Sequence, residues 1–353
     1  MKGSGRSLFL RVTAVIGLLV FAFLIWRIGP GVIWKELRKL DAWTIALLFG
    51  MRAGYLLFRT WIWRTVYARY DAPPPFGHLF AARIAGHAVS YLTPSAYVGG
   101  EAVRALMIEG RDRKPVLASV IVDTTFGVLG VGALAGLGVI ALVAASPLPF
   151  SGRAALAASF AASALVLGLL VRKQRSGFFG WLAGIPARIG LRPRFIERNR
   201  ERIRRVDEHI ADFYVRGDGG PLQVFALYML LNAFWIMEIF VTLRALGAPG
   251  LTIGKSVLVG AFGAVGLIVP TTPASLGTYE ATNLAVFAGL GWGAGLGMSM
   301  ILVRRALSLF WAGVGLFIIA RKHIRLRPVP ETPGENEEGS PLRASDKVLD
   351  RPE

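Results

Sequence analysis

The sequence contains no cysteine and only four histidines in 353 residues. The absence of cysteine excludes disulfide bonds, thiolate catalysis and cysteine-ligated metals. No two histidines stand three or four positions apart, so none form the one-face pair that often binds a metal ion. We therefore expect no metal site, and nothing in the sequence assigns a cofactor.

Acidic residues are also scarce, since 22 Asp and Glu face 40 Lys and Arg. Charged residues make up 18% of the chain and hydrophobic residues 54%, before 42 glycines are added. A soluble domain is about 25% charged, so a soluble chain of this length could not bury so much apolar surface. The composition predicts an all-α polytopic membrane protein. No aromatic platform accompanies the basic residues, so we do not expect nucleic-acid binding.

Six apolar runs are long enough to cross a bilayer, which takes about 20 helical residues. They are residues 8–26, 42–58, 116–145, 154–171, 222–246 and 294–320. Two further apolar stretches, 76–108 and 256–290, are each interrupted midway by Pro and Gly, which end helices. We expect broken helical hairpins there, either re-entrant or fully spanning. Ordinary loops between short tilted helices are the alternative.

The distribution of Lys and Arg predicts the orientation of the chain in the membrane. With the N-terminus inside and each hairpin emerging on its entry side, most basic residues fall in inside segments; residues 27–39 are an exception. We therefore expect a multi-pass protein of the bacterial inner membrane, with both termini cytoplasmic.

Outside the spans, two polar segments stand out. Residues 172–220 would be a cytoplasmic linker, containing either an amphipathic helix on the anionic inner leaflet or a solvated segment that sets the topology. Residues 329–353 are rich in Pro and acidic residues, which predicts a disordered acidic tail. This leaves residues 1–328 as the integral membrane domain.

The two interruptions share a sequence pattern. TPSAYVGGEA at 93–102 and TPASLGTYEA at 272–281 have Thr, Pro, Glu and Ala at the same spacing. Each interruption has one span before it and one after it, which gives repeat units of about 42–145 and 222–320. In the predicted orientation the units have opposite topology. Such an inverted-topology repeat is the architecture of many secondary transporters, in which broken helices meet near the bilayer midplane.

Eight ionisable residues lie in or beside the apolar stretches: Arg52, Glu101, Arg104, Asp123, Glu238, Glu280, Arg304 and Arg305. A charge at the centre of a membrane helix costs about 2.5–3.5 kcal/mol on insertion scales, so we expect each residue to face the bundle interior beside a partner. The four acids and four arginines make a neutral set. Glu101 and Arg104 are three residues apart and can pair on one helix face, and Glu280 has Arg304 and Arg305 as its nearest candidates. Such pairs either hold helices together or bind a phosphate, which suits the planar fork of arginine.

Three segments carry a family resemblance: TPSAYVGGEAVRALMIEG at 93–110, ASVIVDTT at 118–125 and VPTTPASLGTYEA at 269–281. Together they resemble the flippase-like membrane domain of the lysylphosphatidylglycerol synthase family. The similarity covers about residues 8–325. The sequence also resembles, more loosely, the branch of the family associated with hopanoid lipid biosynthesis. The residues that match the family motifs are Pro94, Gly99, Gly100, Glu101, Arg104, Pro270, Pro273, Gly277 and Glu280.

The sequence departs from the family pattern at two places. Ala274 and Ser275 stand where the family usually has Gly, which predicts a less tight turn, and Asp123 is followed by Thr124 instead of Arg. Full-length synthases of the family append a soluble aminoacyl-transferring domain, whereas only a short acidic tail follows Arg327 here. The resemblance therefore implies the lipid-handling half without the synthetic chemistry.

The leading prediction is a non-enzymatic membrane protein that binds an anionic phospholipid or a lipid-linked phosphate and moves it between leaflets. The candidate substrate-binding residues are Pro94, Gly99, Gly100, Glu101, Arg104, Asp123, Pro273, Gly277, Glu280, Arg304 and Arg305. Arg104 with Arg304 or Arg305 would hold the phosphate, and Glu101 and Glu280 would release it by competing for the same arginines. No catalytic residue is assigned.

Two other functions fit the sequence. One is a membrane-embedded transferase or hydrolase of a lipid phosphate, although no metal-ligand carboxylate pair or histidine signature supports it. The other is a non-transporting scaffold that recruits lipid-modifying enzymes through residues 172–220. Anionic membrane lipids are the expected partners in the leading prediction. The sequence leaves open the identity of the lipid, the direction of movement and the oligomeric state, a homodimer included.

Overall fold

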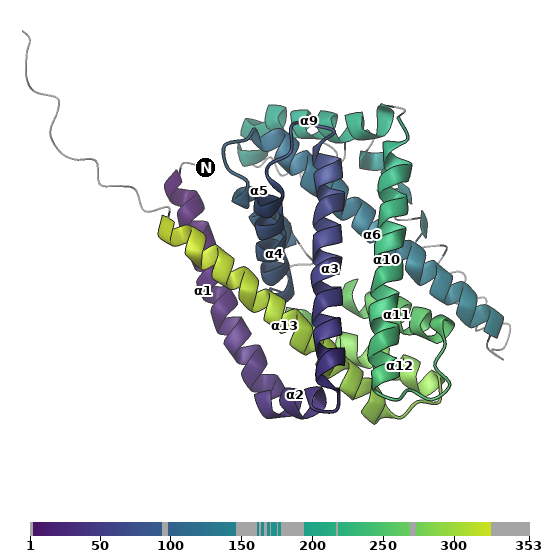
Figure 1. Ribbon diagram of the computed structural model, residues 1–353. Coiled ribbons are helices and arrows are strands. Elements are labelled where there is room, and N and C mark those ends of the chain that lie inside the picture. Colours follow the sequence, from purple (N-terminus) through teal and green to yellow (C-terminus); the bar gives the residue numbers. More distant parts are fainter. Residues whose placement is uncertain are drawn as a thin grey trace, which may run out of the picture.

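The computed structural model describes residues 3–93, 98–145, 194–216, 218–268 and 273–325, with a few residues between 161 and 177. All regular secondary structure in these residues is helical. The elements are α1 (Gly3–Ile28), α2 (Pro30–Leu37), α3 (Ala42–Tyr67), α4 (Phe76–Leu92), α5 (Val98–Met107), α6 (Arg113–Ala145), α9 (Arg194–Val215), α10 (Gly220–Ala245), α11 (Ile253–Ile268), η1 (Pro273–Ser275), α12 (Thr278–Gly289) and α13 (Ala294–Arg325). Figure 1 shows them as a bundle of long helices with α9 lying across one end.

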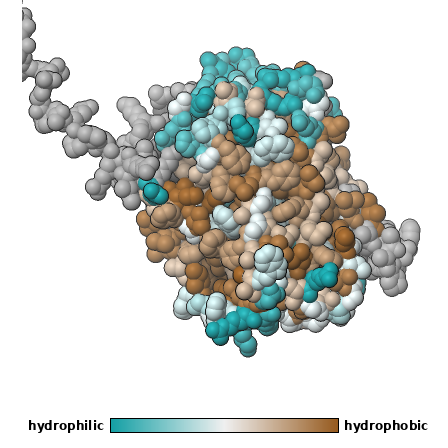
Figure 2. All heavy atoms as spheres, viewed as in Figure 1, coloured by the Kyte–Doolittle hydropathy of each residue, from teal (hydrophilic) through white to brown (hydrophobic). Residues whose placement is uncertain are grey.

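Four helices of the described residues are long and apolar enough to cross a membrane: α3, α6, α10 and α13. The end of α1 and α2 together can be counted as a fifth span. The two helices are bent by 66° relative to each other at Gly29. The left-handed φ of Gly29 and the proline that follows it explain this bend. Figure 2 shows a broad hydrophobic band between two hydrophilic ends. The protein is therefore a multi-pass membrane protein, as predicted.

The predicted spans agree with these helices in part. Residues 42–58, 116–145, 222–246 and 294–320 fall within α3, α6, α10 and α13. Residues 8–26 fall within α1, whose described part qualifies as a span only together with α2. Most of 154–171, like the predicted tail at 329–353, lies outside the described residues.

Both predicted interruptions are breaks between helices. In the first, α4 ends at Leu92 and α5 begins at Val98; in the second, α11 ends at Ile268, η1 follows, and α12 begins at Thr278. The two arms of each hairpin pack against each other. Figure 1 shows α4 and α5 toward the end of the bundle that carries α9, and α11 and α12 toward the other end.

Each hairpin also packs against the last long helix of the other half of the chain, α4 against α13 and α11 against α6. Glycines make both contacts close. A Cβ on Gly315 of α13 would lie 2.5 Å from the carbonyl oxygen of Ile84, and a Cβ on Gly138 of α6 would lie 2.4 Å from Cβ of Ala261. The glycine-rich stretch of α6 therefore serves helix packing, as its small-residue spacing indicates.

The amphipathic helix α9 has its apolar side against the bundle. Ile210 and Phe213 are buried in a cluster with residues of α3, α6 and α10, such as Val66, Phe126 and Val224. One of the two predictions for this linker placed its apolar side on the lipid surface. Here it covers the end of the helix bundle instead, and exposed Arg and Glu side chains such as Arg204 and Glu208 point away from that cluster.

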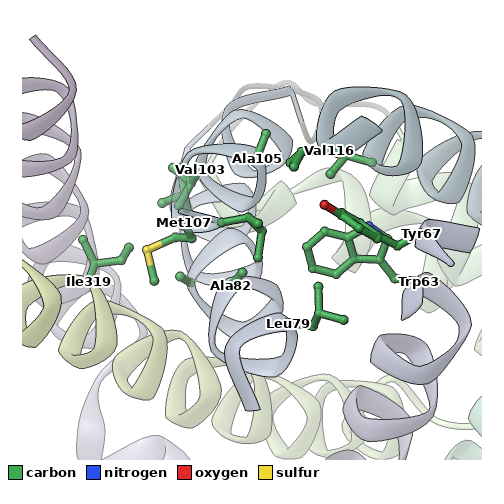
Figure 3. Packing of buried hydrophobic residues seen from close by; sticks show 13 residues of the cluster. Trp63, Tyr67, Leu79, Ala82, Val103, Ala105, Met107, Val116 and Ile319 are labelled. Carbon is green, nitrogen blue, oxygen red and sulfur yellow. The ribbon is translucent and has the colours of Figure 1, made fainter. Parts of the chain in front are cut away.

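Another apolar cluster joins α3 to the first hairpin. Figure 3 shows Trp63 and Tyr67 of α3 packed near Leu79 of α4 and Val116 of α6, with side chains of α5 and α13 around them. Trp63 and Tyr67 are among the largest fully buried side chains of the described residues. This apolar cluster fixes the distance between α3, α4 and α6, and charged side chains lie directly beside it.

Candidate functional site

The first charge cluster is built around Asp123 of α6, which is fully buried. Its Oδ2 accepts hydrogen bonds from Nη2 of Arg83 at 2.9 Å and from Nη2 of Arg104 at 2.7 Å. Its Oδ1 accepts one from the hydroxyl of Tyr228 at 2.7 Å. Arg104 also pairs with Glu101, one turn earlier on α5. Four helices, α4, α5, α6 and α10, therefore meet at one carboxylate.

The indole ring of Trp63 lies against both buried arginines of this cluster. The guanidinium carbon of Arg104 is 4.2 Å from the ring centroid, and that of Arg83 is 5.2 Å away. Cation–π attraction is strongest where water is excluded, as it is here. The cation–π contacts and the shared carboxylate together stabilise two guanidinium groups in an apolar bundle.

Close packing of α5 on α4 places Glu101 and Arg104 in this cluster. A Cβ on Gly100 would lie 1.9 Å from Oγ of Ser90 and 2.3 Å from the carbonyl oxygen of Gly86. No larger residue fits between the two helices there without moving them apart. Gly100 is thus a structural requirement for bringing α5 against α4.

The second charge cluster is built around Glu238 of α10, which is also fully buried. Its Oε1 accepts hydrogen bonds from Nη2 of Arg52 at 2.5 Å and from Nη1 of Arg304 at 3.2 Å. Nε of Arg304 donates to the hydroxyl of Tyr279 at 3.1 Å. The second cluster therefore repeats the arrangement of the first, since one buried acid holds arginines from two other helices, α3 and α13.

The remaining pair of the second cluster, Glu280 of α12 and Arg305 of α13, sits at the break of the second hairpin. Nε of Arg305 donates to Oε1 of Glu280 at 2.8 Å, and Nη1 donates to the carbonyl oxygen of Ala274 at 3.3 Å. Oε2 of Glu280 accepts a hydrogen bond from the backbone N–H of Gly277 at 2.7 Å. Glu280 thus both caps the start of α12 and anchors α13 to the turn.

The turn before α12 uses left-handed backbone at positions that glycine favours. Gly277 has a φ of 90°, and Ala274 and Ser275 have φ values of 55° and 50°. These last two are the residues at which the family usually has Gly. Both residues adopt the left-handed conformation despite their side chains. The expectation of a less tight turn there stays a prediction.

The two clusters resemble each other in exposure as well. The side chains of Glu101 and Glu280 are 19% and 20% exposed, whereas their partners Arg104 and Arg305 are 2% and 4% exposed. Glu101 and Glu280 occupy the same position in the two similar segments. Each interruption therefore presents one accessible carboxylate that neutralises one buried arginine.

The comparisons with known proteins agree with this architecture. The family model of the lysylphosphatidylglycerol synthase TM region matches residues 11–315, which include both interruptions and both charge clusters. The chain belongs to this family. It is also 29% identical over 314 residues to a UPF0104 membrane protein of Methanothermobacter thermautotrophicus, a match that covers 85% of this chain and 91% of that protein. The resemblance inferred from the motifs is confirmed.

The eight charged residues predicted from the sequence all have a partner of opposite charge in this family member. Glu101 pairs with Arg104, and Glu280 with Arg305, as expected. Arg304 pairs with Glu238 instead of Glu280. Of the other candidate residues, Gly99 and Gly100 lie in the first turn of α5, and Pro273 begins η1. Pro94 and Pro270 lie outside the described residues.

The expectation of a neutral set is wrong, because two further arginines belong to the first cluster. Arg83 is buried and shares Asp123 with Arg104. Arg59 interacts electrostatically with Asp123 and Glu101. The predicted span ends at residue 58, one residue before Arg59, but α3 continues to Tyr67. The seven-residue spacing between Arg52 and Arg59 could have indicated this, because it places the two arginines on one helix face.

The described residues contain no group of three or more His, Asp or Glu side chains arranged to hold a metal ion. The second cluster instead combines three buried arginines with two carboxylates. In the first, Arg59 joins Arg83 and Arg104 beside two carboxylates. Arginine donors in such an arrangement suit an oxyanion, phosphate above all.

Proposed function

We propose that this protein binds an anionic lipid, or a lipid-linked phosphate, by its phosphate group and moves it across the bacterial inner membrane without altering it chemically. The observation that supports this function best is the equivalent placement of Glu101 and Glu280. Each is an accessible carboxylate that holds a buried arginine at a broken hairpin. A phosphate that enters from either side would compete with the carboxylate for that arginine.

The surplus of positive charge supports the same proposal. In the second charge cluster three arginines face two acids, Glu238 and Glu280. Excess positive charge inside a membrane bundle is unfavourable unless an anion or water accompanies it. A bound phosphate would neutralise it, so the clusters favour an anionic substrate over a zwitterionic one.

An inverted-topology repeat explains how access could alternate between the two sides. The hairpins lie toward opposite ends of the bundle, and each packs on the last long helix of the other half. Each cluster also takes one residue from the other half, since Tyr228 of α10 contacts Asp123 and Arg52 of α3 contacts Glu238. A shift of α3 against α10 would therefore change both clusters together and move accessibility from one to the other.

The orientation and span count belong to the same proposal. We place the α9 end in the cytoplasm together with both termini, because the linker around α9 is strongly basic. Residues 154–171 would complete a set of six spans. The lipid surface next to α9 would then be the anionic inner leaflet, which attracts basic segments.

Lipid scrambling in proteoliposomes tests the proposed function. Vesicles would carry fluorescent phosphatidylglycerol, phosphatidylcholine or a polyprenyl phosphate. We expect the wild type to exchange the anionic lipids between leaflets faster than empty liposomes do, and faster than phosphatidylcholine. Arg104→Gln and Arg305→Gln should each slow this exchange by about tenfold or more, since a hydrogen bond to a charged group corresponds to such a factor.

The matched control is Arg64→Gln, because Arg64 is an exposed arginine of α3 outside both clusters. It should scramble as the wild type does. Mass spectrometry of the recovered lipid should show no covalent change, whereas a cleaved or transferred headgroup would favour the enzyme alternative. If no anionic lipid in the panel moves faster than in empty liposomes, the proposed function is wrong.

A further inference from the structure

Arg59 of α3 is set apart from the other arginines of the two charge clusters. Every arginine of those clusters forms an ion pair with a buried or half-buried acid. Arg59 takes part in no ion pair of the described residues, and its buried Nε has no hydrogen-bond partner among them. As a whole residue, Arg59 is half-buried.

The surroundings of Arg59 place it beside the first cluster. Its electrostatic interactions are with Tyr55 and Tyr228, followed by Asp123 and Glu101. Asp123 and Glu101 already hold Arg83 and Arg104. With Arg59 included, the first cluster therefore has three arginines and two acids, which is the same surplus as in the second.

Tyr55 and His87 provide further hydrogen-bonding groups beside Arg59. Tyr55 is one turn away on α3, lies 5.9 Å from the guanidinium carbon of Arg52, and interacts with Arg304 of the second cluster. His87 on α4 interacts with Arg52, Arg59 and Arg83. Both side chains are half-buried. Arg59 and these two residues therefore form a polar patch, here called the seam, that reaches from one charge cluster to the other.

We propose that the seam is the site that receives the anionic group, with Arg59 as its main ligand. The expected ligand class is a phosphate mono- or diester. The planar fork of Arg59 would donate two hydrogen bonds to phosphate oxygens, and the hydroxyl of Tyr55 and the imidazole of His87 would donate to the others. This inference rests on the proposed function and deepens it, because a phosphate at the seam is bound without first breaking an Arg–Glu pair.

The seam also changes the order of events expected from the sequence, which gave the phosphate to Arg104 and Arg304 or Arg305 directly. A phosphate on Arg59 neutralises the surplus charge of the first cluster while Arg104 stays with Glu101. Exchange onto Arg104 or Arg305 follows as the helices shift. Arg59 is therefore the residue that governs affinity, and the Glu101 and Glu280 pairs govern release.

Binding to the purified full-length protein in detergent tests this inference. Isothermal titration calorimetry would use three probes: dihexanoyl phosphatidylglycerol, dihexanoyl phosphatidylcholine and inorganic phosphate. We expect Arg59→Gln to weaken binding of the phosphatidylglycerol by about tenfold or more. Arg59→Lys should weaken it less, because lysine keeps the positive charge but lacks the planar guanidinium group that donates two parallel hydrogen bonds. Arg64→Gln on the same helix should bind as the wild type does.

The two anionic probes distinguish the sources of the phosphate. If inorganic phosphate binds and is also weakened in Arg59→Gln, the seam recognises the phosphate group itself, as proposed. If only the lipid binds, and binds through Arg59, the seam is a lipid-headgroup site that needs the acyl chains. Wild-type affinity of Arg59→Gln for dihexanoyl phosphatidylglycerol overturns the inference.

Thermal unfolding separates binding from a structural role. Since Arg59 makes no ion pair with any residue that the structure describes, Arg59→Gln should unfold at the wild-type temperature or above it. A clear loss of stability would mean that Arg59 holds the bundle together. If Arg59→Gln does not fold, Tyr55→Phe carries the same binding test with a smaller expected loss. If the wild type and Arg59→Gln scramble lipid equally, the seam is not the binding site but the proposed function stands. If binding depends on Arg59 but no lipid is scrambled, the proposed function is wrong but the binding site stands.

Discussion

At the scale of single residues, Asp123 and Glu238 have the same role. Each is an acid without solvent exposure that accepts hydrogen bonds from two arginines on different helices. Removing one partner of a buried ion pair leaves an uncompensated charge, which costs more than the pair itself contributes. The two acids therefore hold the helices of each cluster in position, whatever ligand the arginines bind.

We predict that Asp123→Asn loses about 3–5 kcal/mol of unfolding free energy, because Arg83 and Arg104 would then share no buried carboxylate. Denaturant unfolding in mixed micelles measures this. Glu101→Gln is the matched control, since Glu101 is partly exposed and Arg104 still pairs with Asp123 in this variant. Its loss of unfolding free energy should be much smaller. Equal losses in the two variants would contradict the assigned role of Asp123.

The sequence revealed these residues but not their partners. A charge in an apolar helix stands out, so all eight candidates could be identified. Glu238, however, pairs with Arg52 and Arg304, which are 186 and 66 residues away. No local spacing connects residues that meet only in the folded bundle. Glu101 and Arg104 were predicted as a pair because they are neighbours on one helix.

At the scale of helices, the α4–α5 hairpin depends on the close approach at Gly100. We predict that Gly100→Ala is destabilising by about 1–3 kcal/mol, because the new Cβ would overlap Oγ of Ser90 and the backbone of Gly86. Gly77→Ala on the same hairpin is the control, since nothing lies within 4 Å of a Cβ there. It should be neutral, or stabilising by about 0.5–1 kcal/mol. Thermal unfolding in detergent compares the two, and equal midpoints would refute the packing argument.

An ion pair also fastens the start of α10 to the loop after α3. Arg69 Nη1 donates to Asp218 Oδ1 at 2.6 Å, and the backbone N–H of Gly220 donates to the same oxygen at 3.0 Å. These hydrogen bonds, the one from Arg69 above all, lower the pKa of Asp218 from its usual range. A carboxylate with a lowered folded pKa stabilises the protein above its unfolded pKa, about 3.9, and loses that contribution as the pH falls through the folded value.

We therefore predict a pH-dependent difference between the wild type and Asp218→Asn. The wild type should unfold at the higher temperature at pH 6, and the gap should close as the pH is lowered below about 4. Unfolding temperatures measured at several pH values in one detergent test this. A gap that stays constant across the range would show that Asp218 acts through something other than its charge.

Helix breaks were easier to predict than helix packing. Pro and Gly at both interruptions indicated where α4 and α11 end, because each of them disfavours a continuing helix. The apolar side of α9 was also visible in the sequence, but what it packs against was not. Ile210 and Phe213 could equally well enter lipid or cover a bundle, and only the neighbouring helices decide between these.

At the scale of the whole molecule, the two ends of the bundle differ in character. The end that carries α9 is rich in Arg and Glu. At the other end, where α1, α2 and α3 meet, Trp26, Trp34 and Trp43 are all exposed. Exposed tryptophans gather at membrane interfaces, and basic segments gather on the cytoplasmic side. The fold class and multi-pass character followed from composition and from the apolar runs. Inside a bilayer only helices and closed barrels satisfy all of their backbone hydrogen bonds.

Orientation leads to the last prediction, for which the cysteine-free sequence is well suited. Ala72 follows α3 at the α9 end, and Ala245 ends α10 at the other end; both are exposed. In intact cells a membrane-impermeant maleimide should label Ala245→Cys but not Ala72→Cys, and permeabilised cells should label both. Because α3 and α10 are the equivalent first helices of the two proposed repeat units, labelling of both sites from one side would mean that these helices do not cross the bilayer in opposite directions. The inverted repeat, and alternating access through it, would then be wrong, whereas the paired arginines of the two charge clusters would stand.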